Sequence, residues 1–160
     1  MNKYWPVPDW ISTYSYKQNP RNFGSKRAGG RVHAGCDLYA PLGAPVLAIA
    51  DGRVLESRDF YLGTFQVTID HGALGVVRYG EVSPDDIPNT GAVVEAGQQI
   101  GKIGHLGRGL HPMLHIEHFS GAATGSVTNS NNPPYSRRSD LQDCTKLLDS
   151  LLCLRDKTCK

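Results

Sequence analysis

The chain of 160 residues lacks the features that mark several large classes of protein. It has no run of about 20 apolar residues, which a helix needs to span a bilayer. It has no strong excess of charge either, because 17 lysines and arginines stand against 15 acidic residues. The basic residues are scattered, which is not typical of a nucleic-acid-binding protein. We therefore expect neither membrane insertion nor a nucleic-acid partner.

Cysteines are few and no C-x-x-C pair occurs, which argues against a thiolate zinc knuckle. Cys144 and Cys153 would lie about 13 Å apart on one helix, too far for a disulfide. Cys153 and Cys159 can pair if the chain turns back between them. Cys36 is expected to be a small buried thiol. An even number of cysteines suits an oxidising destination.

Long stretches of helical periodicity are also missing, whereas glycine (18) and proline (10) are plentiful. The segment TFQVTIDHG alternates, with Phe65, Val67 and Ile69 on one face, and GVVRYGEV completes a hairpin with it. Two β-prone runs flank the turn signal Asp51-Gly52, and MLHIEHF is a further strand. We predict a mainly β fold of the curved antiparallel sheet or sandwich type, with long loops.

The domain organisation is expected to be simple. The leucines between positions 147 and 154 have helical spacing, and Asp143 is placed to cap the start of that helix. We predict a single domain over 1–160, made of an irregular lead-in (1–30), a core (31–119), a polar loop (120–139) and a C-terminal amphipathic helix and tail (140–160).

The segment GRVHAGCDLYAPLGAPV brings a histidine and an aspartate close together in the sequence. On an ideal strand His33 and Asp37 would be about 13 Å apart, so they can share one ion only if the chain kinks, as Gly35 allows. A catalytic zinc usually has three protein ligands, and HPMLHIEHF offers His115 as the third. The alternative is a histidine bonded to a turn aspartate, with His115 as a core residue.

Three motifs occur in a fixed order: H-x3-D followed by DLYAPLGAPVLAIADGRV, then IDHG…VVRYGEV, then GQQIGKIG…MLHIE. From about Arg31 to Phe119 the chain thereby resembles the LytM/lysostaphin-type zinc endopeptidases of the M23 family. The resemblance implies a small curved antiparallel sheet with a groove for an extended peptide. It also implies one Zn²⁺ per chain, bound by His33, Asp37 and His115.

The chain departs from the family pattern at two positions where the resemblance implies catalytic histidines. Met113 stands at the first histidine of H-x-H, and Glu81 stands at the histidine of the central Y-x-H-L. A nearby carboxylate can serve as general base beside zinc, so Glu81 is the first catalytic candidate. His111, which could stabilise the oxyanion, is the second. The residues predicted to contact substrate are His71, Arg78 and Tyr79.

The resemblance implies hydrolysis of peptide cross-links in bacterial peptidoglycan, with stem peptides as the substrate. The N-terminus has no continuous apolar segment, so we expect no signal peptide. An enzyme made in the cytoplasm that acts in the periplasm or cell wall would then be an antibacterial effector delivered by a secretion system, or a phage lysin. We expect a monomer, and an immunity protein that plugs the groove.

Two other functions remain open. A LytM-like module without activity would bind peptidoglycan or activate a partner amidase, and the two missing histidines favour that alternative. A structural zinc domain would need a fourth ligand, for which His111 is the candidate.

Overall fold

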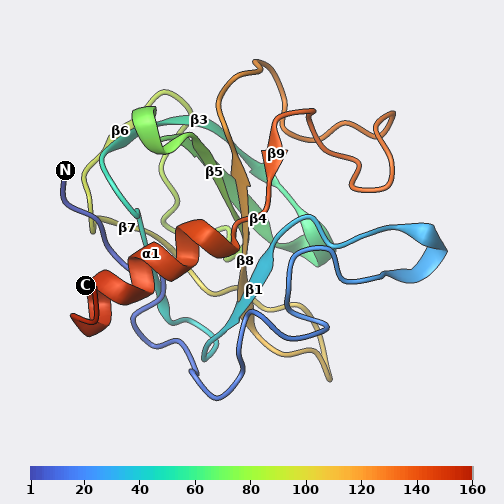
Figure 1. The fold of residues 1–160 in the computed structure, drawn as a ribbon, viewed down its shortest axis with the longest axis horizontal. Helices are drawn as coiled ribbons and strands as arrows, with labels where there is room; N and C mark the ends of the chain where they lie inside the picture. Colours follow the sequence, from blue (N-terminus) through green and yellow to red (C-terminus); the bar gives the residue numbers. More distant parts are fainter. Residues whose placement is uncertain (160) are drawn as a thin grey trace.

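The computed structural model describes residues 1–159 and confirms a mainly β architecture. Its main sheet has seven strands, all pairs antiparallel, in the order β1-β8-β5-β4-β3-β6, with β9 paired to β8 (Figure 1). The strands are β1 (Cys36–Tyr39), β3 (Gly52–Asp59), β4 (Phe65–Asp70), β5 (Val76–Val82), β6 (Val93–Val94), β8 (Met113–Phe119) and β9 (Leu141–Gln142). A second sheet pairs β2 (Pro45–Leu47) with β7 (Gln99–Lys102).

The hairpin formed by β4 and β5 is present as predicted. Val67 and Ile69 enter the core, but the polar residues of β4 are not exposed on the other face. Gln66 and Thr68 are both 1% exposed and bond to each other, with the Thr68 hydroxyl donating to Gln66 Oε1 at 2.6 Å. The two runs around Asp51-Gly52 are strands too, although β2 and β3 belong to different sheets.

One α-helix, α1 (Thr145–Asp156), lies across one face of the main sheet (Figure 1). It packs on the core through Leu147, Leu148 and Leu151. The predicted cap is shifted by one position, because Cys144 occupies the cap position. The Asp143 carboxylate nevertheless accepts a hydrogen bond from the Thr145 N–H at 2.8 Å. The short 3-10 turns are Ala28–Gly30, Tyr61–Gly63 and Gly72–Leu74.

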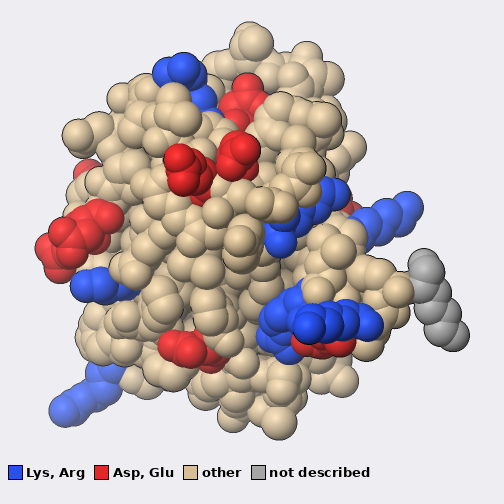
Figure 2. Space-filling view, turned by 90° about the vertical axis from the view of Figure 1, so that its left-hand side faces the viewer, with Lys and Arg blue, Asp and Glu red and all other residues tan. Residues whose placement is uncertain are grey.

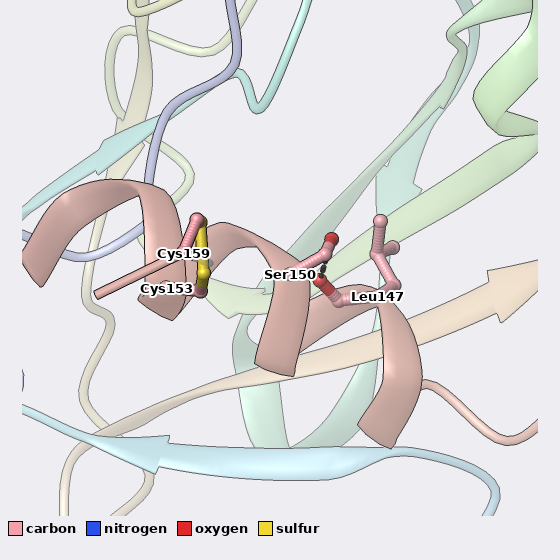
Figure 3. The surroundings of a disulfide bond; sticks show 4 residues. All are labelled: Leu147, Ser150, Cys153 and Cys159. Carbon is pink, nitrogen blue, oxygen red and sulfur yellow. Dashed lines mark hydrogen bonds between the residues drawn. A yellow bond between two sulfur atoms is a disulfide. The ribbon is translucent and has the colours of Figure 1, made fainter. Parts of the chain in front are cut away.

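The chain turns back at the end of α1, where Lys157 has a left-handed backbone conformation (φ 55°). This turn brings Cys159 to Cys153, and the two form a disulfide (Figure 3), a pairing that the sequence allowed but did not decide.

The N-terminal lead-in has no strand, but it is part of the core. Trp5, Val7 and Tyr16 are at most 4% exposed and belong to the same apolar cluster as β1 and α1. On the face drawn in Figure 2, acidic and basic side chains form small separate groups rather than one patch. Within residues 1–159, no helix has the length and apolar character to cross a membrane.

Candidate metal centre

Three side chains from two adjoining segments converge in the structure. Asp37 of β1 and His115 of β8 are directly opposite each other in the antiparallel register, and His33 comes from the segment just before β1. Asp37 Oδ1 is 2.9 Å from His115 Nδ1 and 3.1 Å from His33 Nε2. The two ring nitrogens are themselves 3.1 Å apart. The three residues singled out in the sequence therefore form one compact cluster.

Gly35 makes this convergence possible. A Cβ atom at this position would lie 2.3 Å from the carbonyl oxygen of Ile116, which is a severe overlap. Strand β1 starts only at Cys36, so His33 is not bound to the spacing of an extended strand. The predicted kink is real, and it is what brings His33 to Asp37.

The hydrogen bonds of the two rings set which nitrogen is free. His33 Nδ1 is 2.9 Å from the carbonyl oxygen of Asn22 and donates its proton there. His115 Nε2 is 2.9 Å from Glu117 Oε1 and donates there. His33 Nε2 and His115 Nδ1 both face the Asp37 carboxylate, and their lone pairs become free for a metal ion once these nitrogens are deprotonated. Two imidazole nitrogens and one carboxylate oxygen are a donor set that fits Zn²⁺.

The electrostatics of the cluster favour positive charge. Burial alone would raise the pKa of Asp37, yet its hydrogen bonds to His115 and His33 lower it to about 2. Burial would lower the pKa of His115, but its bonds to Asp37 and Glu117 outweigh this and raise it to about 10. A cation at this point would therefore be stabilised by its surroundings.

Glu117 is a further candidate site residue, which the sequence did not single out. It is fully buried, and besides His115 it contacts Arg137, whose Nη2 is 2.8 Å from Oε1, and Arg78, whose Nη1 is 3.4 Å from Oε2. Burial would raise the pKa of Glu117, but Arg78 and His115 hold it well below its usual value. Its alternation with His115 along MLHIEHF was the available signal. Glu117 orients the His115 ring.

This network gives Arg78 a positioning role that the sequence did not predict. Its side chain is 2% exposed, and its guanidinium is committed to Glu117 and to the hydroxyl of Thr128, which it reaches at 2.7 Å. Arg78 lies at the floor of the cleft and holds the Glu117 carboxylate in place. The contact of Arg78 with substrate stays a prediction, because Arg78 also lines the cleft.

Glu81 faces the same cleft as the metal cluster because of a β-bulge. Gly80 pairs with His115, so in an unbroken strand the next side chain would point to the opposite face, into the core. The register with β4 instead skips Glu81, pairing Gln66 with Gly80 and Phe65 with Val82. Glu81 has φ +64°, a conformation that side-chain-bearing residues rarely adopt. The bulge turns its carboxylate toward the cleft.

The surroundings of Glu81 leave its carboxylate reactive. The side chain is 9% exposed, and its Oε2 is buried with no hydrogen-bond partner within the described chain. Burial raises the pKa of Glu81 to about 7. The charge of His115 opposes this shift, whereas the charge of Asp37 adds to it. A carboxylate with this pKa can accept a proton near neutral pH.

The cleft has a volume of about 780 Å³ and contains the metal cluster, Glu81 and Met113. The Phe60 ring lies 5.9 Å from that of His115, and Arg27 Nη2 is 3.7 Å from Asp37 Oδ2. Further walls are formed by Arg31, Arg58, Tyr61, Leu106, Leu110, Tyr135 and Arg137. This volume lies within the range of ligand-binding clefts in proteins.

The structure places His71 and Tyr79 elsewhere, which corrects their predicted contact with substrate. Tyr79 is fully buried and faces the core opposite Ile116. Its hydroxyl accepts from the Ile49 N–H at 3.1 Å and donates to His71 Nε2 at 2.9 Å. His71 Nδ1 donates to the Asp51 carbonyl at 3.0 Å. The pair joins β4 and β5 to the turn before β3.

His111 is also placed differently from its predicted role. Its exposed ring stacks on Tyr39, with centroids 4.7 Å apart, and it is not among the described residues that line the cleft. The metal cluster contains three candidate ligands in the described part of the chain, and His111 is not one of them. Three candidate ligands are the number that catalytic zinc sites usually provide, whereas structural zinc sites usually provide four.

Fold and site together define a β-sheet domain with a three-donor candidate metal site in a cleft, an arrangement typical of metallohydrolases. The sequence model of peptidase family M23 matches residues 31–130, and the chain belongs to that family.

The chain is similar to known members over most of its length. It is 36% identical over 109 residues to the peptidoglycan DD-endopeptidase ShyB of Vibrio cholerae, which covers 64% of this chain and 25% of that protein. A zinc-containing peptidase from Vibrio cholerae superposes with a TM-score of 0.54 at 35% identity, covering 72% of this chain and 35% of that one. The catalytic domain of lysostaphin from Staphylococcus simulans superposes with a TM-score of 0.61 at 25% identity. The match covers 80% of this chain and 89% of that domain. The chain spans about a quarter of the length of ShyB and of other curated relatives that it matches.

Proposed function

We propose that the protein is a zinc-dependent endopeptidase that hydrolyses peptide cross-links of bacterial peptidoglycan. The observation that carries this proposal is the three-donor cluster in one cleft with Glu81, a buried carboxylate that has one oxygen unpartnered. The relatives support the substrate class, since ShyB is named as a peptidoglycan DD-endopeptidase and the S. simulans neighbour as the antimicrobial peptidase lysostaphin.

His33, Asp37 and His115 would hold one Zn²⁺, and Glu117 keeps the His115 ring in the tautomer that leaves Nδ1 free. Bound zinc supplies Lewis acidity, polarising a carbonyl and making water more acidic. Glu81 accepts the proton of the attacking water at its carboxylate and passes it to the leaving amine. The ring of Phe60 and the apolar wall of the cleft limit the access of bulk water to these groups.

The test is digestion of purified Gram-negative sacculi, with muropeptides separated by chromatography and identified by mass spectrometry. Wild type, Glu81→Gln and His115→Ala run side by side with Glu95→Gln, an exposed control, and the zinc content of each is recorded. We expect wild type and the control to convert cross-linked dimers to monomers. Glu81→Gln should keep zinc and lose cleavage, and His115→Ala should lose both.

A second function is favoured by one observation. Met113 lies in the cleft where a proton-transferring histidine is implied, and a thioether cannot transfer protons. A module without activity would bind sacculi or stimulate an amidase. In that case the zinc-loaded wild type would release no muropeptide monomers, but the protein would still pellet with the sacculi.

We further propose that the protein acts at the cell wall of a competitor as an antibacterial effector, with an immunity protein occupying the cleft. The Cys153–Cys159 disulfide is compatible with an oxidising compartment of this kind. Expression directed to the periplasm should lyse cells, whereas cytoplasmic expression and periplasmic Glu81→Gln should not. Lysis that persists with Glu81→Gln would contradict this.

A further inference from the structure

Two cysteines on the side of β1 away from the cleft are in contact. Cys36 of β1 and Cys144, at the cap of α1, are both fully buried, and they are 108 positions apart in the sequence. Their Sγ atoms are 2.8 Å apart. Figure 1 shows the start of α1 beside β1.

This separation is too short for two sulfur atoms that merely pack together. Non-bonded carbon atoms already prefer about 3.5–4.0 Å, and sulfur is larger than carbon. A disulfide needs about 2.05 Å, so less than 1 Å of approach separates the thiols Cys36 and Cys144 from a covalent bond. Their surroundings, including the core residues that enclose both, already hold the two side chains face to face.

A metal ion is the competing explanation, because Asp143 lies near both sulfurs. Tetrahedral zinc holds thiolates at about 2.3 Å, which puts two ligating sulfurs about 3.8 Å apart. The observed 2.8 Å leaves no room for an ion between them. Asp143 is also exposed, and its Oδ1 already accepts the Thr145 N–H. The geometry favours a bond between the sulfurs.

We propose that Cys36 and Cys144 form a second disulfide when the chain folds under oxidising conditions. The two thiols give up two protons and two electrons, and an exchanging disulfide such as oxidised glutathione takes them up and becomes two thiols. Together with Cys153–Cys159 this would leave the chain without a free thiol.

The bond would act on the fold and on the metal centre at once. It closes a long loop, which restricts the unfolded chain far more than the six-residue separation of Cys153 and Cys159 does. It also anchors β1 to α1 at the residue before Asp37, whose side chain points to the cleft from the opposite face of the strand. Oxidation would therefore steady the strand that carries a metal ligand.

The test uses the full chain with Cys153→Ser and Cys159→Ser, so that only Cys36 and Cys144 remain. The protein is refolded in a mixture of oxidised and reduced glutathione, then denatured and alkylated, and its mass is measured. We expect no alkylated thiol, and a tryptic cross-link between peptides 32–53 and 139–146. Two alkylated thiols in protein with a native circular dichroism spectrum would overturn the proposal. So would zinc that is bound by the refolded protein and lost when Cys36 and Cys144 are replaced.

Thermal unfolding gives an independent measurement on the same variant. Its oxidised form should melt about 5–15 °C above its reduced form, the range expected for closing a long loop. The matched control carries Cys36→Ala and Cys144→Ala and keeps Cys153 and Cys159, and oxidation should shift its melting temperature much less. Equal melting of the oxidised and reduced forms of the first variant would contradict the proposed link. If the control variant fails to fold, the thiol count on the first variant still tests the proposal.

Discussion

Glu117 affects the metal centre only through the ring of His115. Its carboxylate accepts the Nε2 proton of that ring and is in turn held by Arg78 and Arg137. Such partners keep a ligand in the right tautomer and make it a stronger donor. We therefore expect the strength of metal binding to depend on Glu117, which lies outside the set of candidate ligands.

We predict that Glu117→Gln lowers zinc affinity by about 10–100-fold, because a neutral amide holds the ring less firmly. The change also leaves the buried guanidinium of Arg78 and the partly exposed one of Arg137 poorly compensated, so the free energy of unfolding should fall by about 3 kcal/mol. Competition with a chromogenic chelator measures the affinity, and urea unfolding measures the stability. Glu95→Gln, on the surface, should change neither. An unchanged zinc affinity would show that Glu117 has no part in orienting His115.

Glu81 should govern the pH dependence of catalysis. Burial raises its pKa to about 7, and a base works only when deprotonated, so activity is full above the pKa and is lost as the pH falls through it. A bound cation favours the carboxylate, which places the acidic limb of kcat/KM at or below pH 7. We expect Glu81→Gln to lose about 10²–10⁴-fold in kcat and to lack this limb. A wild-type profile that stays flat through the acidic range would assign the proton transfer to another group.

At the scale of elements, the site depends on two irregularities in neighbouring strands. The break at Gly35 lets His33 reach Asp37, and the bulge at Glu81 turns that carboxylate out of the core. Regular strands would separate these groups, since successive side chains alternate between faces. The functional residues lie where the sheet departs from ideal geometry, as is common for β-bulges near active sites.

We predict that Gly35→Ala destabilises the fold by about 1–3 kcal/mol, because its methyl group would overlap the Ile116 carbonyl. The displaced segment should also carry His33 away from the cluster and weaken zinc binding. Gly101→Ala is the matched control, since its Cβ would be 3.5 Å from the nearest atom, on Val82, an ordinary contact. Urea unfolding and zinc titration of both variants check this. Equal behaviour of the two variants would contradict the role given to Gly35.

For the whole molecule, metal binding and folding should be coupled. The ligands come from a segment before β1, from β1 and from β8, and they meet only in the folded chain. A ligand that binds only the native state at about 1,000 times its Kd adds about 4 kcal/mol to stability.

We predict that chelation lowers the melting temperature by roughly 8–16 °C, given about 2–4 °C per kcal/mol for a chain of this size. Differential scanning calorimetry with and without a chelator measures the shift. His115→Ala should melt at the same temperature in both conditions because its site is incomplete. An unchanged melting temperature of the wild type in chelator would show that zinc binding does not stabilise the fold.

The sequence alone determined the fold class, the β4–β5 hairpin, the strand MLHIEHF, the C-terminal helix and the residues that form the metal cluster. These features depend on local periodicity, on turn residues and on three separated motifs in a fixed order, all of which are readable along the chain. The need for a kink at Gly35 was also visible, because strand spacing would otherwise keep His33 and Asp37 apart.

Only the tertiary structure decided which polar residues face the cleft. Tyr79 and His71 point to the core and Arg78 is committed to Glu117, because strand register and burial select one face for each side chain. The bulge at Glu81 and the meeting of Cys36 with Cys144 depend on how distant segments pack. Periodicity describes one strand at a time, whereas these contacts arise between elements that are far apart in the sequence.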